Sequence, residues 1–308
     1  MPEAAGGARV GTAEKVIMQC SLIAALSRAS GLMLLSAPLP HQVDLDATAI
    51  GEEVRRLSMR YQGKVAFITG GAIGFGRAFA QALGREGATV VIADIDEMQA
   101  QETAMALTAE SIRAVAVHCD VADEAQVDEA VAKTLDQCSG IDVLINNAGK
   151  HLTKYNQPFG TLSRDEIRSL FDVNIMGVIN CSTACRETMR ARGGGVILNI
   201  SSIAGHMVTN PYGVSKLAVR GLTIAFAHEF AADAIRVNAI SPGLMATESA
   251  MADLSEAMIS EFRDRLQLVH RTGSMNDIVS AMLYLCSSEA SFITGETLRV
   301  TGGYPLSL

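Results

Sequence analysis

The chain has 308 residues, of which 49% are hydrophobic and 19% are charged, so it can bury a substantial core and is not intrinsically disordered. Its formal net charge of −8 argues against a nucleic-acid partner, because binding to a phosphate backbone requires clustered Lys and Arg. The cysteines form no CxxC pair and the histidines are scattered. We therefore expect a cytoplasmic protein with reduced thiols and no metal site.

Residues 1–58 differ in character from the rest of the chain. Their apolar stretch is interrupted by Arg28, so no uncharged run reaches the roughly 18 to 20 residues that span a bilayer, and the stretch is also a poor secretory signal. Three interpretations remain open: a poorly ordered extra segment, a helix that packs on the domain or on a partner, or an upstream start that the cell does not use. Met59 would itself be a normal beginning, so we assign 1–58 to an N-terminal extension and 59–308 to the main domain.

Beyond this extension, short apolar runs alternate with segments of helical length. Near-continuous hydrophobicity is typical of strands that are buried on both faces of a sheet. The predicted strands are 65–69, 89–93, 114–118, 143–145, 196–200 and 237–240, and the predicted helices are 74–86, 96–109, 123–138, 163–190 and 211–231. This order predicts a single doubly wound α/β domain with a parallel sheet of about seven strands and helices on both faces.

A glycine cluster follows the first predicted strand and precedes the first predicted helix. It contains Gly70, Ile73, Gly74 and Gly76. Glycines in such a turn let the backbone approach a pyrophosphate, and the helix N-terminus supplies amides and positive potential. A glycine cluster by itself is most often only a turn. The dinucleotide site is predicted because this cluster lies between a strand and a helix.

Asp94 ends the second predicted strand. A carboxylate at this position can accept hydrogen bonds from the ribose hydroxyls of adenosine, and it would repel a 2′-phosphate. Neither the glycine cluster nor the neighbourhood of Asp94 contains Arg or Lys, and Arg77 lies just beyond on the helix. The pattern favours NAD over NADP. The alternative is that Asp94 is a solvated cap of the next helix.

Two further strand ends carry polar groups. Asp120 and Val121 follow the third predicted strand, and Asn146 and Asn147 follow the fourth. Ligands of open parallel sheets bind beyond the carboxyl ends of the strands. We therefore expect these residues to border the cofactor, with Asp120 accepting from the adenine amino group, although each alone is more commonly a cap or turn residue.

Tyr212 and Lys216 lie four residues apart and therefore one turn apart on the same helix face. Asn210 suits the cap of this helix and Pro211 its first position. The positive helix end and the neighbouring ammonium both favour phenolate, so we expect a lowered pKa for Tyr212 and a role as general base. A Tyr-x-x-x-Lys pair alone is usually a surface feature.

The ordered set of motifs resembles the short-chain dehydrogenase/reductase family from about residue 64 to residue 303. The resemblance implies a Rossmann-fold, NAD(P)-dependent oxidoreductase, commonly a homotetramer or homodimer built through its long helices. It also implies roles for individual residues. The implied catalytic group is Asn174, Ser202, Tyr212 and Lys216, and the implied holders of the nicotinamide carboxamide are Met245 and Thr247.

Two departures from the family pattern concern the site. Nine residues separate Ser202 from Tyr212, whereas the family usually has about twelve, so the loop that normally borders the substrate pocket is shortened. Ser202 is preferred as the catalytic serine because it is the second of a pair, and Ser201 remains the alternative. Thr301 stands where the family often has Asp.

The resemblance implies that Tyr212 transfers the substrate proton, that Lys216 assists it and holds the nicotinamide ribose, and that Ser202 holds the substrate oxygen. Asn174 would anchor a water in a proton relay. Residues 248–270 correspond to the family's substrate lid and read as one apolar helical stretch.

Such a lid suits a hydrophobic secondary alcohol or its ketone: a cyclic or terpenoid alcohol, a steroid or a β-hydroxyacyl thioester. Two alternatives stay open, an NADP-dependent 3-oxoacyl thioester reductase and a catalytically silent nucleotide-binding sensor or scaffold. The presence of all four residues of the catalytic group argues against the silent protein.

Overall fold

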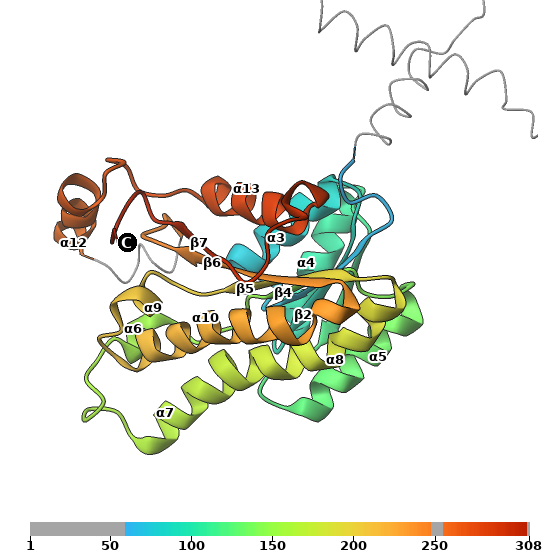
Figure 1. Cartoon of the computed structure of the whole chain (residues 1–308), viewed down its shortest axis with the longest axis horizontal. Helices are drawn as coiled ribbons and strands as arrows, with labels where there is room; N and C mark the ends of the chain where they lie inside the picture. Colours follow the sequence, from blue (N-terminus) through green and yellow to red (C-terminus); the bar gives the residue numbers. More distant parts are fainter. Residues whose placement is uncertain (1–58, 248–254, 307–308) are drawn as a thin grey trace, which may run out of the picture. The chain divides into compact units, whose positions relative to one another are not determined.

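The computed structural model describes residues 59–247 and 255–306, so the assigned extension lies outside the described residues. One parallel sheet has the order β3-β2-β1-β4-β5-β6-β7 (Figure 1). The predicted doubly wound α/β architecture is confirmed. The strands are β1 (Val65–Thr69), β2 (Thr89–Asp94), β3 (Ala114–His118), β4 (Val143–Asn146), β5 (Gly195–Ile200), β6 (Ile235–Pro242) and β7 (Thr297–Val300).

Helices connect the strands and cover the sheet. They are α3 (Gly74–Arg85), α4 (Glu97–Ala109), α5 (Glu124–Gln137), α6 (Leu152–Tyr155), α7 (Arg164–Phe171), α8 (Gly177–Ala191), α9 (Ala204–Met207), α10 (Pro211–Glu229), α12 (Glu256–Glu261) and α13 (Met275–Cys286). Short polar side chains start several of them: Asp96 accepts from Gln99 N at 3.0 Å, and the predicted capping box of Ser163 and Glu166 is present. Such caps satisfy backbone amides that have no partner within the helix.

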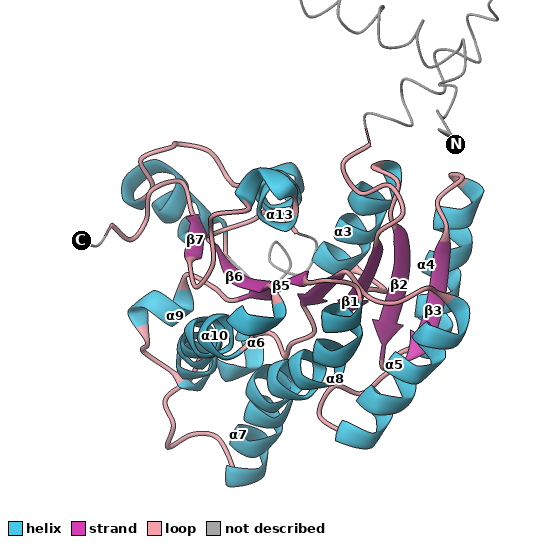
Figure 2. Cartoon of the chain, turned by 45° about the vertical axis from the view of Figure 1, so that its right-hand side comes forward, coloured by secondary structure: helices cyan, strands magenta, loops and turns pink. Residues whose placement is uncertain are grey.

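The core consists of two apolar layers, one on each face of the sheet. Alternate residues of β1 point to opposite faces, so Ile68 packs with α3, α4 and α13, whereas Phe67 packs with α5, α8 and α10. Figure 2 shows the helices on both sides of the strands. The strand order reverses between β1 and β4, and a crevice for ligands opens beyond the carboxyl ends of the strands at such a point.

Two predicted helices differ from the structure. The predicted helix 163–190 is continuous in path, but a π-helical turn, Asp172–Met176, separates α7 from α8. The predicted helical lid 248–270 is wrong in its last part. Residues 248–254 lie outside the described residues, α12 is followed by a second π turn (Phe262–Leu266), and Gln267 is extended. Hydrogen bonds from Leu268 and Val269 to the Gly302 carbonyl hold this extended segment.

No helix in the ranges 59–247 and 255–306 is both long enough and apolar enough to cross a membrane.

Candidate active site

The glycine loop between β1 and α3 packs directly against the end of β4. A Cβ on Gly70 would lie 2.9 Å from the Ala148 Cα, and one on Gly76 would lie 2.1 Å from the Gly70 carbonyl oxygen. The Asn147 side chain donates hydrogen bonds of 3.0 Å to the Thr69 carbonyl and 2.8 Å to that of Gly70. Asn147 therefore fixes the loop from the neighbouring strand, and only glycine fits at the two contacts.

The first turn of α3 is open to an anion. Ile73 stands at its N-cap, makes no side-chain cap and is 65% exposed, and the turn contains no acidic residue. The amides of this turn therefore have no side-chain acceptor, which suits a pyrophosphate. The geometry of the loop is compatible with the pyrophosphate of a dinucleotide and does not distinguish NAD from NADP.

Asp94 is half-buried at the end of β2, beside the glycine loop. Its carboxylate accepts from the Ala72 amide at 3.0 Å and from the Asp96 amide at 3.1 Å. Since Asp96 is the residue that caps α4, Asp94 is not that helix cap. Two backbone donors hold Asp94 in place while its remaining lone pairs stay available to a ribose.

Asp120 and Val121 lie just after the end of β3. The Asp120 carboxylate accepts from the Ala122 amide at 2.9 Å, and the Val121 carbonyl accepts from the Asn180 side chain at 2.9 Å. The Val121 side chain is buried against Gly177, where a Cβ would approach it to 2.6 Å. These contacts fix the segment but do not themselves identify a ligand.

The first turn of α10 carries Tyr212, as the sequence predicted. The Asn210 side chain caps this helix by accepting from the Gly213 amide at 2.8 Å. A hydrogen bond joins the Tyr212 hydroxyl to the Ser202 hydroxyl. One turn later, Lys216 is 5% exposed, and its Nζ donates to the Ile200 carbonyl at 2.8 Å and lies 5.7 Å from the centre of the Tyr212 ring.

The pKa of Tyr212 corrects the expectation from sequence. Burial raises the pKa of Tyr212 to about 12, and the hydrogen bond from Ser202 lowers it only in part. Burial also lowers the pKa of Lys216 to about 8. Helix position and an adjacent ammonium were expected to dominate. Desolvation outweighs them because the free-energy cost of removing a charged group from water is larger than the stabilisation that the helix end and the ammonium provide.

The two adjacent serines have different surroundings. The Ser201 hydroxyl is buried and donates to the Lys216 carbonyl at 2.8 Å. The Ser202 hydroxyl is half-buried, accepts from the Ala204 amide at 3.1 Å and faces Tyr212. Only Ser202 is thus placed with the phenol.

Asn174 lies in the π turn and is 1% exposed. Its Oδ1 accepts from the Lys150 amide at 2.7 Å, and its Nδ2 donates to the Ser215 hydroxyl at 3.0 Å. A Cβ on Gly149 would lie 3.3 Å from Asn174 Oδ1 and 3.5 Å from Lys216 Nζ. The fold therefore brings Asn174 Oδ1 and Lys216 Nζ together on the side of Gly149 where a Cβ would lie. Sequence reasoning missed Ser215, although a polar residue beside Lys216 was a possible signal.

The shortened loop between Ser202 and Tyr212 folds as α9 and lies flat on α10. A Cβ on Gly205 would be 2.7 Å from the Lys216 carbonyl carbon, and one on Gly213 would be 2.8 Å from the Ala204 carbonyl oxygen. Val208 closes the loop in a left-handed conformation with a φ of 53°, which is unfavourable for a β-branched residue. Two glycines and one strained residue thus accommodate the short connection.

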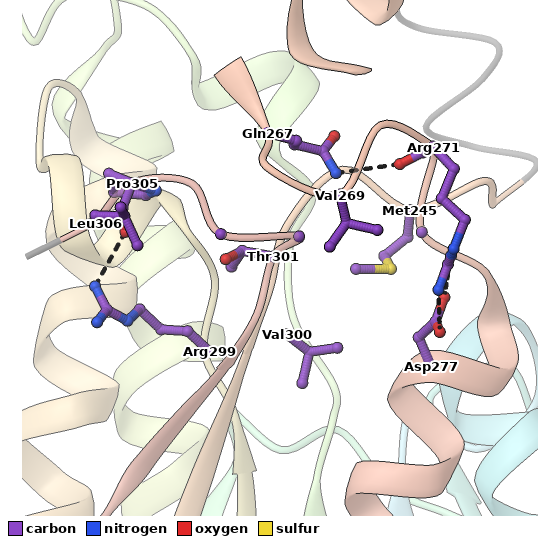
Figure 3. A pocket seen from close by; sticks show the side chains of 13 residues that line it. Met245, Gln267, Val269, Arg271, Asp277, Arg299, Val300, Thr301, Pro305 and Leu306 are labelled. Atoms are coloured by element: carbon purple, nitrogen blue, oxygen red, sulfur yellow. Dashed lines mark hydrogen bonds and ion pairs between the residues drawn. The ribbon is translucent and has the colours of Figure 1, made fainter. Parts of the chain in front are cut away.

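Met245 and Thr247 follow β6. Met245 is buried and pairs with Gly273 in an isolated bridge, whereas Thr247 is half-buried and is the last described residue before 248–254. Met245 also lines a pocket of about 430 Å³ that contains none of the four predicted catalytic residues. Figure 3 shows the ion pair of Arg271 with Asp277 on one side of this pocket and Arg299 bonded to the Pro305 carbonyl on the other.

Comparison with known proteins identifies the family. The family model described as enoyl-(acyl carrier protein) reductase matches residues 70–305. A probable short-chain type dehydrogenase/reductase of Bradyrhizobium diazoefficiens is 36% identical over 249 residues, which cover 79% of this chain and 88% of the relative. The chain belongs to the short-chain dehydrogenase/reductase family.

Two other proteins that are similar to this chain have more specific names. A 3α-hydroxysteroid dehydrogenase of Mediterraneibacter gnavus is 36% identical over 252 residues, covering 79% of this chain and 98% of the relative. A 7α-hydroxysteroid dehydrogenase solved with NADH and 7-oxo glycochenodeoxycholic acid superposes with a TM-score of 0.75 at 29% identity, covering 81% of this chain and 96% of that one. The family's oxidoreductase activity and its use of NAD(P) therefore apply to this chain.

Proposed function

We propose that this protein is an NAD-dependent oxidoreductase that interconverts a hydrophobic secondary alcohol and its ketone. The observation that carries the proposal is the hydrogen-bonded pair of Ser202 and Tyr212 hydroxyls beside the buried Lys216 ammonium. Such a pair supplies a donor for the substrate oxygen and a group that exchanges its proton.

In the proposed reaction, Ser202, Tyr212 and Lys216 have separate roles. A nicotinamide cofactor, when bound, would provide the hydride-transfer chemistry. Ser202 donates to the substrate oxygen and stabilises charge that develops there. Tyr212 takes the alcohol proton during oxidation and returns it during reduction. Lys216, held by the Ile200 carbonyl, stabilises the phenolate because a cation favours the charged form of a neighbouring acid.

The preference for NAD is proposed from Asp94. Its carboxylate is held by the Ala72 and Asp96 amides beside the glycine loop, where it would repel the 2′-phosphate of NADP. Met245, Thr247 and the first turn of α3 would hold the rest of the dinucleotide. An NADP-dependent 3-oxoacyl thioester reductase is the alternative, since the matching family model is described as a reductase of acyl carrier protein substrates.

The substrate class is proposed from the apolar lid and from the relatives. The described part of the lid carries Met258 (44% exposed), and the segment after it carries Leu268 (65% exposed) and Val269 (50% exposed). Apolar side chains of this kind suit a bulky hydrophobic alcohol. Two similar proteins are named hydroxysteroid dehydrogenases, so polycyclic alcohols are the first class to test.

A homo-oligomer is proposed from one face of α10. Leu217, Gly221 and Ile224 are spaced to lie on one helix face, and the two apolar side chains are 42% and 53% exposed. Apart from the backbone of α10 itself, no atom of the described residues lies within 4 Å of a Cβ on Gly221. A face with a small residue between two apolar ones lets a second helix approach closely. We propose that this face meets α10 of a second copy.

The proposal is tested by calorimetric titration with NAD⁺, NADH, NADP⁺ and NADPH, followed by turnover of cyclic, terpenoid and steroid alcohols. We expect NAD(H) to bind at least tenfold more tightly than NADP(H), and an Asp94→Ala variant to lose most of that preference. A Glu97→Ala variant, which removes an exposed acid three residues away, is the control. Tighter binding of NADP(H) would contradict the proposed NAD preference and would favour the 3-oxoacyl thioester reductase. Binding without turnover of any alcohol or ketone would favour the silent sensor.

A further inference from the structure

Ser215 is a fully buried residue between Tyr212 and Lys216 on α10. Its hydroxyl donates to the Tyr212 carbonyl at 2.7 Å and accepts from Asn174 Nδ2 at 3.0 Å. The Ser215 hydroxyl proton is therefore bonded to the Tyr212 backbone, and one lone pair of the same oxygen is bonded to the Asn174 side chain. A buried hydroxyl satisfied in this way has one orientation.

The direction of these hydrogen bonds fixes the Asn174 amide. The Lys150 amide is a donor, so the atom that faces it at 2.7 Å must be Oδ1, and Nδ2 must point to Ser215. Within the described residues, the other hydrogen bond of Nδ2 is a long one, 3.5 Å to the Lys150 carbonyl. Without the Ser215 hydroxyl, a buried donor would keep only this long contact, and the side chain would be free to turn.

The surroundings of Asn174 connect this amide to the Lys216 ammonium. Asn174 lies in the π turn, in which the Gly177 amide bonds to the Asp172 carbonyl five residues earlier, and such turns interrupt the regular α-helical ladder. Gly149 faces Asn174 Oδ1 and Lys216 Nζ together, at 3.3 and 3.5 Å from an added Cβ. A change in the position of Asn174 therefore changes the environment of the ammonium.

We propose that Ser215 is a positioning residue: it holds the Asn174 amide and the π turn in the arrangement that keeps Lys216 beside the Tyr212 phenol. The assignment rests on the proposed function and extends it by one residue. Ser215 does not contact the reacting atoms. It acts by joining three segments: the residues after β4 through Lys150, the π turn through Asn174, and the first turn of α10 through the Tyr212 carbonyl.

The same helix contains a matched control. Thr223 is also fully buried, its hydroxyl accepts from Asn199 Nδ2 at 2.9 Å, and it donates to the Val219 carbonyl at 2.8 Å. The chemistry is the same as at Ser215, a buried amide bonded to a hydroxyl that bonds to the helix backbone. Thr223 lies two turns further along and is not part of the proposed site.

The test compares Ser215→Ala with Thr223→Ala in the full chain. Kinetics with NAD⁺ and the best alcohol are measured from pH 6 to 10, together with Tm and the Kd for NADH. We expect similar losses of Tm in the two variants. Only Ser215→Ala should lower kcat, by about tenfold at pH 7, with KM and the NADH Kd changed less than about twofold.

The pH dependence separates positioning from structural damage. With Lys216 less well placed, phenolate formation needs a higher pH, so the kcat deficit of Ser215→Ala should shrink as the pH rises to 10. General destabilisation would enlarge the deficit at pH 10 instead. Ser215→Thr retains the hydroxyl and should recover most of kcat.

Two outcomes overturn the proposal. A Ser215→Ala enzyme with the kcat and pH profile of Thr223→Ala would assign Ser215 a structural role only, while the proposed function would stand. A wild-type protein that turns over no alcohol or ketone would remove the proposed function and the positioning role together. If Ser215→Ala does not fold, Ser215→Cys, which keeps a weaker hydrogen bond, replaces it, and an unchanged kcat in that variant would equally reject the assignment.

Discussion

The Lys216 ammonium lies 5.7 Å from the centre of the Tyr212 ring, where Lys216 is buried and Tyr212 is half-buried. Burial raises the pKa of the phenol to about 12 and lowers that of the ammonium to about 8. Both shifts favour the uncharged forms. Tyr212 is therefore the protonated phenol at neutral pH, and Lys216 is the neighbouring cation that favours phenolate.

Replacement of Tyr212 by Phe removes the group that exchanges the substrate proton. We expect kcat to fall about 10²- to 10⁴-fold, while the Kd for NADH changes little because the glycine loop and Asp94 are untouched. Steady-state kinetics and NADH titration check this. Tyr284→Phe, which alters a 40% exposed tyrosine on α13, is the control. Full turnover by Tyr212→Phe would show that Tyr212 does not exchange the substrate proton.

The raised pKa of Tyr212 predicts opposite pH dependences for the two reaction directions. Oxidation needs the deprotonated phenol, so its kcat/KM should increase with pH, by up to about tenfold per unit, until the phenol is ionised. Reduction needs the protonated phenol and should stay level over the same range and then decline. Both profiles are measured from pH 6 to 10. An oxidation rate that falls as the pH rises through this range would contradict the assignment of Tyr212 as base.

The lowered pKa of Lys216 predicts that its effect on stability depends on pH. Between about pH 8 and 10.5 the unfolded chain keeps the proton that the folded chain has released, so the unfolded state binds more protons and stability rises with pH. Below pH 8 both states are charged, and the full cost of burying the ammonium is present. The unfolding free energy of the wild type, relative to Lys216→Met, should therefore rise by up to about 3 kcal/mol between pH 7 and pH 10. Urea unfolding of both proteins at pH 7 and pH 10 measures this change. A relative unfolding free energy that falls from pH 7 to pH 10 would contradict a lowered pKa of Lys216.

Gly213 is required for the contact between α9 and α10. An added Cβ would lie 2.8 Å from the Ala204 carbonyl oxygen and 3.1 Å from the Val208 Cα, both backbone atoms. Gly213→Ala should therefore lower the unfolding free energy by about 1–3 kcal/mol and should lower kcat, because α9 must move and Ser202 precedes it. Denaturant unfolding and kinetics test this. Gly160→Ala has no atom within 4 Å of the added Cβ and should be close to neutral. Equal stability of the two variants would argue against a tight α9 contact.

Ile224 tests the proposed assembly through α10. Ile224→Glu places a charge on the exposed apolar face, and burial of an unpaired charge opposes association. We expect light scattering after size exclusion to show a smaller particle than the wild type. Met105→Glu, on α4 and 65% exposed in the wild type, should leave the mass unchanged. A monomeric wild type, or an unchanged mass in Ile224→Glu, would reject this face as an interface.

Part of the fold was predictable because its causes are local. Runs of apolar residues such as 65–69 and 89–93 are strands because each is buried on both faces of the sheet, and the capping box of Ser163 and Glu166 starts α7 as expected. The seventh strand, β7, was not recognised as a run because its four residues are only partly buried. The π turn was also missed, since no local pattern distinguishes 172–176 from an ordinary helical segment.

The sequence by itself determined the order of strands and helices, the glycine loop, and the placing of Tyr212 and Lys216 on one helix face, because these follow from periodicity and capping within short segments. Tertiary structure alone decided which serine meets the phenol, how Ser215 holds Asn174, and how a nine-residue connection fits against α10. It also decided the direction of the Tyr212 pKa shift. Each of these depends on groups distant in the chain and on the loss of water around them, and desolvation exists only once the segments have packed together.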